Sequence, residues 1–504
     1  MRRTLRPLVL VLLTAALVEA QRADSIVLRE ASSPFVAVNV WVKSGSTGDP
    51  KGKEGLASLT GSLIAAGATA HDSYDAILQK QYPLAAGYAV TVDKEMTTIT
   101  GRVHRDNLDA YYALFKNALL APAFAEADFA RLKAQRLNSL ERARRYSRDE
   151  ELSKQLLFWM AYEGTPYAHP EEGYVDSVRS ITLDDVRAFY RTHVRRGNVT
   201  VAIGGGFPDG FPEKVRGDLD TLPEGAPPAV AVPAPKQPVG VKVLLVDKET
   251  DASSISFGFP IALLRKDPDF VPLLVANSYL GEHRNPVGRL YQVIREARGM
   301  NYGNYSYIEA FPAGYATQQP RVNVARRSQL FEIWIRPVAL TAPGNLHDRT
   351  LFALRAARRE LTQLREQGLP PAAVAASKQF LRDYVGTWGD TLGRRLGYAV
   401  DDAFYGMPAP GFLASLRGAI ERVTPEQVNA AIRTHLRTDG MYLVIVTADA
   451  ARLKEKLVRG EASSITYTSP PGPALAADDQ VIGAVPLGVR ESDVTILPID
   501  RVFQ

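Results

Sequence analysis

Histidine and cysteine are common ligands of catalytic metals, and their distribution in this sequence argues against a conventional site. The sequence has no cysteine, so it has neither a disulfide framework nor a thiolate metal site. None of its histidines forms a close His-x-x-His, His-x-x-x-His or His-x-x-Glu-His pair; they are His71, His104, His169, His193, His283, His347 and His435. We expect each to be a surface or half-buried structural residue rather than a metal ligand.

An apolar helix predicted over residues 55–67 carries small polar residues on one face. It follows an alternating strand at residues 35–43 and a polar turn. Ser58 and Ser62 lie one helical turn apart, and Gly61 precedes Ser62. A neutral hydroxyl is a poor zinc ligand, and glycine has no side chain that accepts a proton. This helix is therefore not expected to hold a catalytic metal.

The elements around this helix belong to a unit that occurs twice. Residues 182–195 align without gaps to residues 424–437, and Thr, Val, Ala, Arg-Thr-His and Arg recur at matching places. Each copy predicts a helix with a threonine N-cap and basic residues in its last turn, and Pro425 suits the first helical position. A β-run follows each copy, at residues 199–203 and 441–446. The pattern indicates an internal duplication.

Within each copy the periodicity predicts an α+β fold. Residues 87–93 and 96–103 alternate across a polar turn, as a β-hairpin does. Residues 125–163 have a helical period. We expect two homologous half-domains, each with a mixed or antiparallel sheet covered by helices.

Composition divides the chain into five parts. The stretch between the two copies is rich in Pro and Ala and has no period, which is typical of an extended linker. After the second copy, Pro-rich residues break the pattern, and residues 494–499 could add a last strand. The predicted parts are a signal peptide (1–20), an N-terminal domain (21–221), a linker (222–238), a C-terminal domain (239–460) and a tail (461–504).

The N-terminus has the pattern of an export signal. Residues 1–6 are basic, residues 7–18 are apolar, and Val18-Glu-Ala20 fits a small-residue cleavage site. A retained membrane anchor is the alternative, but the apolar run is shorter than the about 20 residues that span a bilayer. We expect a periplasmic protein that is cleaved near Ala20 and has no stable membrane insertion afterwards.

The charge of the chain gives no sign of a nucleic-acid partner. The formal net charge is +5, and the basic runs at residues 142–145 and 355–359 are interspersed along predicted helices. Nucleic-acid binders instead concentrate positive charge on one face.

The order and spacing of several segments resemble the pitrilysin/insulinase-type (inverzincin) zinc metallopeptidases over most of the chain. The segments are the first strand and helix, Gly164-Thr-Pro-Tyr167, Gly173, Ser180-Ile-Thr182, the two helix–strand units and residues 498–503. The resemblance implies the pitrilysin-type metallohydrolase fold. It also implies that the family's His-x-x-Glu-His motif falls on Ser58, Gly61 and Ser62. The family's third ligand, a Glu on a later helix, falls on Asn138 or Ser139, and the nearest carboxylate, Glu141, lies on another helix face. No zinc is therefore expected in this chain.

A second element of the family resembles residues 290–307 and is intact. In the family an Arg ending a helix and a Tyr seven residues later face the substrate, and Arg295 and Tyr302 match that spacing. A guanidinium and a phenol both donate hydrogen bonds toward a developing oxyanion, each worth about 3–4 kcal/mol in a dry site. The alternative is structural: Arg295 pairs with Glu296 or a helix terminus, and Tyr302 packs like Tyr305 and Tyr307.

The resemblance implies a division of labour between two chains. Some members are pairs in which one chain holds the zinc and the other carries only the Arg–Tyr element, as in mitochondrial processing peptidase and its bacterial relatives. We expect this chain to be such a metal-free subunit, which encloses peptide substrates for a catalytic pitrilysin-type partner that holds zinc. A stand-alone pseudopeptidase that binds peptides or acts as a scaffold is the alternative, and a peptidase with a rebuilt site is a third reading.

Overall fold

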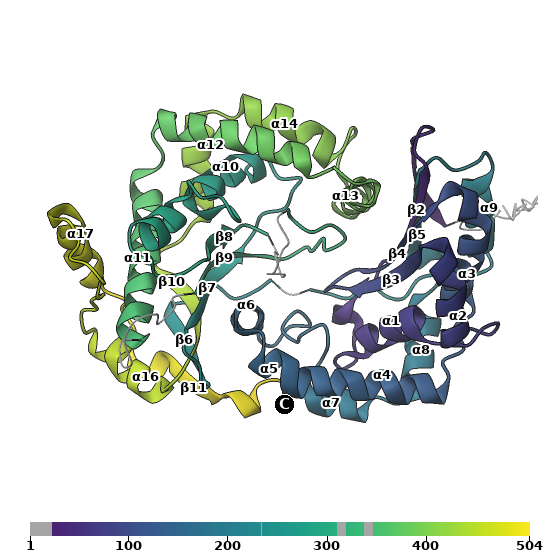
Figure 1. The fold of residues 1–504 in the computed structure, drawn as a ribbon, viewed down its shortest axis with the longest axis horizontal. Helices are drawn as coiled ribbons and strands as arrows, with labels where there is room; N and C mark the ends of the chain where they lie inside the picture. The colour runs from purple at the N-terminus through teal and green to yellow at the C-terminus, as the bar shows by residue number, and fades with distance from the viewer. Residues whose placement is uncertain (1–22, 233, 310–318, 337–345) are drawn as a thin grey trace, which may run out of the picture.

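The computed structural model describes residues 23–232, 234–309, 319–336 and 346–504. Their strands form two sheets, each accompanied by helices, in agreement with the predicted α+β class (Figure 1). The predicted signal peptide, residues 1–20, lies outside the described residues. Within the described part of the chain, no helix combines the length and apolar character that crossing a membrane requires.

Five strands of the first half form one sheet: β1 (Asp24–Arg29), β2 (Phe35–Val42), β3 (Gly87–Val92), β4 (Thr97–His104) and β5 (Val199–Gly205). Their order is β1-β5-β2-β4-β3. β1 runs parallel to β5, and the other neighbours are antiparallel. The predicted hairpin is confirmed as β3 and β4, which leaves β3 at the edge of the sheet.

Six strands of the second half form the other sheet: β6 (Gly240–Asp247), β7 (Ser254–Ile261), β8 (Asn304–Tyr307), β9 (Gln329–Ile335), β10 (Gly440–Thr447) and β11 (Val494–Pro498). Their order is β11-β6-β10-β7-β9-β8. Without β11, this order and its strand directions repeat those of the first sheet. The predicted duplication is therefore confirmed at the level of topology.

The first half has nine described α-helices, and one long helical stretch is divided among several of them. They are α1 (Leu56–Ala66), α2 (Tyr74–Gln81), α3 (Leu108–Leu120), α4 (Glu126–Asn138), α5 (Arg144–Tyr146), α6 (Asp149–Ala161), α7 (Val175–Ser180), α8 (Leu183–His193) and α9 (Phe211–Leu219). The helical period predicted over residues 125–163 is confirmed, but the stretch is divided among α4, α5 and α6. A π-helical turn at Ser139–Ala143 and non-helical backbone at Arg148 interrupt it, because α6 turns away to pack on the other sheet.

The second half also has helices between and after its strands. They are α10 (Phe270–Gly281), α11 (Leu346–Gln367), α12 (Pro371–Tyr384), α13 (Leu392–Tyr405), α14 (Phe412–Arg422), α15 (Pro425–His435), α16 (Ala450–Arg459) and α17 (Pro473–Gly483). α8 and α15 are the predicted repeat helices, and both begin with a capping box, Thr182 with Asp185 and Thr424 with Gln427.

One helix of each half packs against the sheet of the other half. α6 of the first half packs against β7 and β10, and its Leu152, Leu156 and Leu157 belong to an apolar cluster with residues of β6 and β10. α13 of the second half packs Leu392 and Leu396 against β2 and β5 (Figure 1). Because burial of such apolar side chains contributes about 1.5–3 kcal/mol each, the exchange ties the two halves into one body.

The tail returns to the first half after adding a strand to the second sheet. The predicted strand at residues 494–499 is confirmed as β11, which runs parallel to β6. The Val502 carbonyl then accepts a hydrogen bond from Arg145 Nε at 2.8 Å, and the Phe503 carbonyl accepts one from the amide of Val175. No pattern in the sequence indicated α17 in this tail, and the domain boundaries stay predictions.

Most of the histidines have structural partners. The expectation that all are surface or half-buried was wrong for His169, His283 and His347, which are buried. Each ring faces a partner, respectively the Ser46 and Pro170 carbonyls, the Tyr307 hydroxyl and the Ala448 carbonyl. The repeat-matched pair differs in its contacts. The ring of His193 lies against Phe189, and burial lowers its pKa to about 4, whereas His435 Nε2 lies 2.9 Å from Asp269 Oδ2.

Candidate functional site

The loop before α1 fixes where this helix begins. Gly55 has a φ of 100°, a conformation that favours glycine. The buried carboxyl of Asp49 accepts hydrogen bonds from the Gly55 and Ala57 amides, both at 2.7 Å. Burial raises the pKa of Asp49 to about 8. These hydrogen bonds fix the start of α1 and therefore the direction in which each of its side chains points.

That face carries the positions expected for the metal motif. Ser58 and Ser62 are half-buried and line a cavity of about 430 Å³. The Ser62 hydroxyl donates to the Ser58 carbonyl at 2.9 Å, a bond within the helix. Gly61 faces β3, and a Cβ there would lie 2.9 Å from Val90 Cγ1 and 3.0 Å from Val92 Cγ2. The close approach of α1 and β3 therefore leaves no room for a glutamate without local rearrangement.

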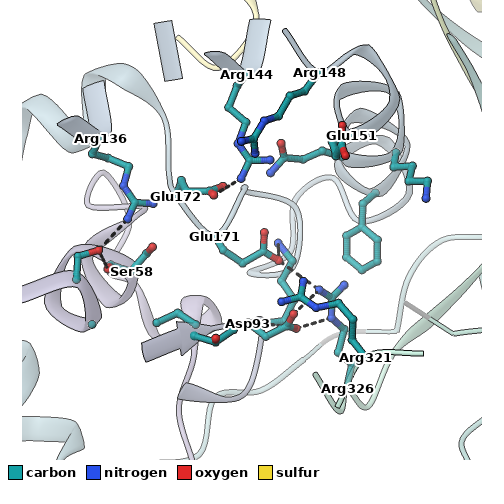
Figure 2. A pocket seen from close by; sticks show the side chains of 18 of the residues that line it. Ser58, Asp93, Arg136, Arg144, Arg148, Glu151, Glu171, Glu172, Arg321 and Arg326 are labelled. Atoms are coloured by element: carbon teal, nitrogen blue, oxygen red, sulfur yellow. Dashed lines mark hydrogen bonds and ion pairs between the residues drawn. The ribbon is translucent and has the colours of Figure 1, made fainter. Parts of the chain in front are cut away.

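A guanidinium reaches the polar face of α1. Arg136, on α4, donates from Nη2 to Ser62 Oγ at 3.0 Å (Figure 2). Burial lowers the pKa of Arg136, Glu172 opposes this shift and Arg144 adds to it. No motif in the sequence pointed to Arg136, although it lies within one turn of Asn138, the place expected for the third ligand.

The nearest carboxylate to that place points elsewhere. Glu141 accepts a hydrogen bond from Arg179 Nη2 at 2.6 Å. It lies in the π-helical turn after α4 and does not line the cavity. Neither it nor Ser139 supplies an oxygen ligand beside Ser58 and Ser62.

Residues of both halves line the cavity, and most of the polar ones are charged. The first half contributes the cations Lys94, Arg136, Arg144, Arg148 and Lys154. The second half adds Arg321 and Arg326 from the segment that leads into β9. The carboxylates are Asp93, Glu151, Glu171, Glu172 and Glu332. With all of these groups ionised, the cations outnumber the carboxylates.

A buried ion network joins the halves at the base of the cavity. Arg326 Nε and Nη2 donate to the two carboxylate oxygens of Asp93 at 2.5 and 2.9 Å. Glu171 Oε1 lies 3.1 Å from Lys94 Nζ and 3.3 Å from Arg326 Nη2. Burial alone would raise the pKa of Glu171, but Lys94 and Arg326 lower it to about 2. Glu171 is therefore ionised at neutral pH.

The cavity does not fit the zinc ion of the metallopeptidase resemblance. Two hydroxyls and a glycine stand at the motif positions, and a guanidinium donates a hydrogen bond to one of those hydroxyls. Zinc sites use imidazole, thiolate or carboxylate ligands, and a cationic neighbour repels the ion. Over the described residues, no group of three His, Cys, Asp or Glu side chains could hold a metal.

Arg295 and Tyr302 are brought together, outside this cavity. Arg295 lies on a π-helical turn (Tyr291–Glu296), and its guanidinium carbon lies 4.7 Å from the ring centroid of Tyr302 and 5.0 Å from that of Tyr291. Tyr302 is 72% exposed. The alternative pairing with Glu296 is not found among the described interactions of Arg295.

A short run of contacts connects this pair to the cavity. The Arg336 amide donates to the carbonyl of Gly303, the residue after Tyr302, at 3.3 Å. Arg336 Nη1 also donates to Glu150 at 2.8 Å, and Glu150 precedes the cavity residue Glu151. The two regions are thus neighbours, joined by the N-terminal end of α6.

The geometry defines a two-domain pitrilysin-type fold without the family's metal ligands, and comparisons with known proteins agree. The Insulinase (Peptidase family M16) model matches residues 25–172, and the Peptidase M16 inactive domain model matches residues 180–381. The chain belongs to peptidase family M16, the insulinase family, so the resemblance seen in the sequence is confirmed. The serines and glycine at the motif positions make it an inactive member of the family.

Similar proteins include one that is named a non-peptidase homolog and one that is named a zinc protease. The chain is 22% identical over 420 residues to the non-peptidase homolog YmxG of Helicobacter pylori, a match that covers 82% of this chain and 89% of that protein. It is 26% identical over 309 residues to an uncharacterized zinc protease of Streptomyces coelicolor. The latter match covers 60% of this chain and 56% of the length of that relative.

Solved structures share the fold over nearly their whole length. A peptidase M16 inactive domain from Pseudomonas fluorescens matches with a TM-score of 0.72 and 23% identity, covering 85% of this chain and 96% of that one. A protease from Helicobacter pylori matches with a TM-score of 0.71 and 14% identity, covering 85% and 97%. At such identities the likeness defines the fold alone.

Proposed function

We propose that this chain is the non-catalytic subunit of a heterodimeric, periplasmic zinc metallopeptidase. A pitrilysin-type partner with an intact His-x-x-Glu-His motif would hold the zinc, and this chain would help to enclose and position the peptide. One observation carries the proposal: the motif positions on α1 hold no ligand, while the half-buried Arg295 stacks on the exposed ring of Tyr302.

The chemistry of the Arg295–Tyr302 pair suits a role at a shared site. Neither side chain has a hydrogen bond or salt bridge among the described interactions, so their donors are not committed to holding the fold. The stacking restricts the guanidinium to one side of the ring, which reduces the entropy lost when it binds a substrate carbonyl. Donors aimed at a developing oxyanion lower the barrier of peptide hydrolysis.

The test is reconstitution with a zinc-bearing relative. The mature chain is co-expressed with a family member that carries the intact motif, ideally from the adjacent reading frame, and co-purification and peptide turnover are measured. We expect Arg295→Ala and Tyr302→Phe each to lower turnover about ten-fold or more without dissociating the pair. Arg452→Ala and Tyr82→Phe are matched controls, because both residues are exposed in other parts of the fold.

The proposal fails if no such partner binds, or if turnover by the pair is unchanged in both variants. Either result would favour the second candidate, a stand-alone pseudopeptidase that binds peptides or acts as a scaffold. The cavity supports that candidate, since both of its walls come from this one chain. Peptide binding by the isolated chain, with no zinc-bearing relative encoded nearby, is the result expected for it.

A further inference from the structure

The cationic wall of the cavity beside α1 has no part in the subunit role proposed above. We propose that this cavity binds a peptide through a carboxylate, either an acidic side chain or the chain terminus, with Arg136 and Arg321 as its receptors. The inference rests on the proposed peptide-binding role and adds the chemical class of peptide. It also assigns a role to the cavity lined by Ser58, Gly61 and Ser62, the positions of the metal motif.

The first observation is the pairing of charges inside the cavity. Asp93 forms an ion pair with Arg326, and Glu171 forms ion pairs with both Arg326 and Lys94. Glu172 forms an ion pair with Arg144. The remaining carboxylates, Glu151 and Glu332, act on Lys154, which they help to keep charged against its burial.

Arg136 and Arg321 have no ion pair with a carboxylate among the described contacts. The one described hydrogen bond of Arg136 goes to the neutral hydroxyl of Ser62. Arg321 has no hydrogen bond or ion pair among the described contacts, and Figure 2 shows it beside Arg326 on the wall contributed by the second half. A guanidinium presents several N–H donors in a planar fork, so both have donors to spare.

The second observation is where Arg136 lies. It contacts α1 at the face where the catalytic members bind a cation, so a positive group is retained there without a metal. Burial lowers the pKa of Arg136, Glu172 opposes this shift and Arg144 adds to it, and a bound anion would further favour the charged guanidinium. A carboxylate matches the guanidinium fork with two parallel hydrogen bonds.

The surroundings favour a carboxylate on a peptide. Val90, Thr91 and Val92 of the edge strand β3 form one wall, and extended peptides add to such edges through backbone hydrogen bonds. The volume of about 430 Å³ admits a few side chains, not a folded domain.

The test uses fluorescein-labelled unstructured peptides that differ only in charge. One set carries an internal Glu or Gln, each with a free or an amidated C-terminus, and binding to the mature chain is followed by fluorescence anisotropy. We expect the Gln peptide with an amidated end to bind about ten-fold or more weakly than at least one carboxylate peptide. Comparing the Glu amide with the Gln free acid identifies which carboxylate is recognised.

Substitutions then assign the effect to the cavity. Arg136→Gln and Arg321→Gln, which lie on opposite halves, should each weaken carboxylate peptides about ten-fold and leave the neutral peptide unchanged. Arg452→Gln is the matched control, and thermal unfolding verifies that each variant is folded. Because the two residues come from different elements, misfolding of one variant leaves the other as a test.

Two results would overturn the inference. Equal affinity for neutral and acidic peptides would remove carboxylate recognition but leave peptide binding, and therefore the proposed function, intact. If none of the peptides binds, carboxylate recognition by the cavity is also excluded. Turnover by the reconstituted pair then tests the proposed function separately.

Discussion

α1 and α10 occupy equivalent places in the two halves, yet they are buried differently. α1 packs against β3, α4 and α8, and α10 packs against the repeat equivalents β8, α12 and α15. α10 is buried almost all round, whereas α1 leaves Ser58 and Ser62 half-exposed toward a charged cavity. The same scaffold thus makes a core helix in one half and a site wall in the other.

The difference shows that loss of the metal ligands has not turned the site into core. Leu, Val or Ala at positions 58 and 62 would suit an apolar helix, but the chain keeps hydroxyls there, next to Arg136. Small polar residues cost little when a cavity supplies a hydrogen-bond partner. α1 therefore keeps one polar face toward the charged cavity while its other faces pack on apolar residues, whereas α10 is surrounded by apolar packing.

The largest expected effect concerns the charges that hold the cavity side. Arg326→Met should lower the free energy of unfolding by about 3 to 5 kcal/mol, because Asp93 would be left buried without its partner. Urea unfolding measures this. Arg395→Met is the control: Arg395 also pairs across the halves, with Glu30, but both side chains are about one-third exposed, so a cost of about 0–1 kcal/mol is expected. Equal losses of unfolding free energy in the two variants would contradict the expected difference between the buried and the exposed ion pair.

A buried carboxyl at the end of α10 predicts a pH effect of somewhat smaller size. Burial raises the pKa of Glu282 to about 8, so the folded state holds this proton where the unfolded chain has lost it. The stabilisation is complete below the ordinary pKa of 4.5 and declines as the pH rises toward 8. Glu282→Gln should reduce the stability lost between pH 5 and pH 8 by up to about 4 kcal/mol.

The measurement for Glu282 is urea unfolding at both pH values. Asp49 has a pKa raised to about 8 and contributes in the same direction, so the variant should flatten the profile only in part. Glu421→Gln, at an exposed position of α14, is the control. A variant whose pH profile matches that of the parent chain would show that Glu282 is not held protonated.

The third prediction concerns the packing of α1 on β3. Gly61→Glu, which introduces the carboxylate of the catalytic motif, should cost about 2 kcal/mol or more, since its Cβ would meet Val90 and Val92. Gly217→Glu on α9 has open space around it and should be neutral or slightly stabilising. If chemical denaturation finds Gly61→Glu as stable as the control, the close approach of α1 and β3 is wrong.

The smallest effect is expected at the Arg–Tyr pair. Tyr302→Ala should change the free energy of unfolding by no more than about 0.5 kcal/mol, because the ring is 72% exposed. Tyr305→Ala should cost about 3 kcal/mol, since that ring is buried against His283 and Trp334. Thermal or urea unfolding separates the two, and a large cost at Tyr302 would favour the structural role left open by the sequence.

Several features of the fold could be predicted from local sequence patterns. The hairpin of β3 and β4, the capped helices α8 and α15 and the strands after them depend on period-two alternation and on capping within four residues. The break between α4 and α6 could not be seen, because the helical period continues through it. What interrupts the helix is the transfer of α6 to the second sheet, a contact with residues far along the chain.

The sequence by itself determined that the motif positions cannot hold zinc and that the chain is a duplicated unit, because ligand chemistry and a repeat are properties of residue types and spacing. Only the tertiary structure decided what replaces the metal site. Arg136 meets Ser62 across 74 residues, and Arg326 meets Asp93 across 233. Neither contact has a local signal, since each forms only when separate helices or the two halves pack together.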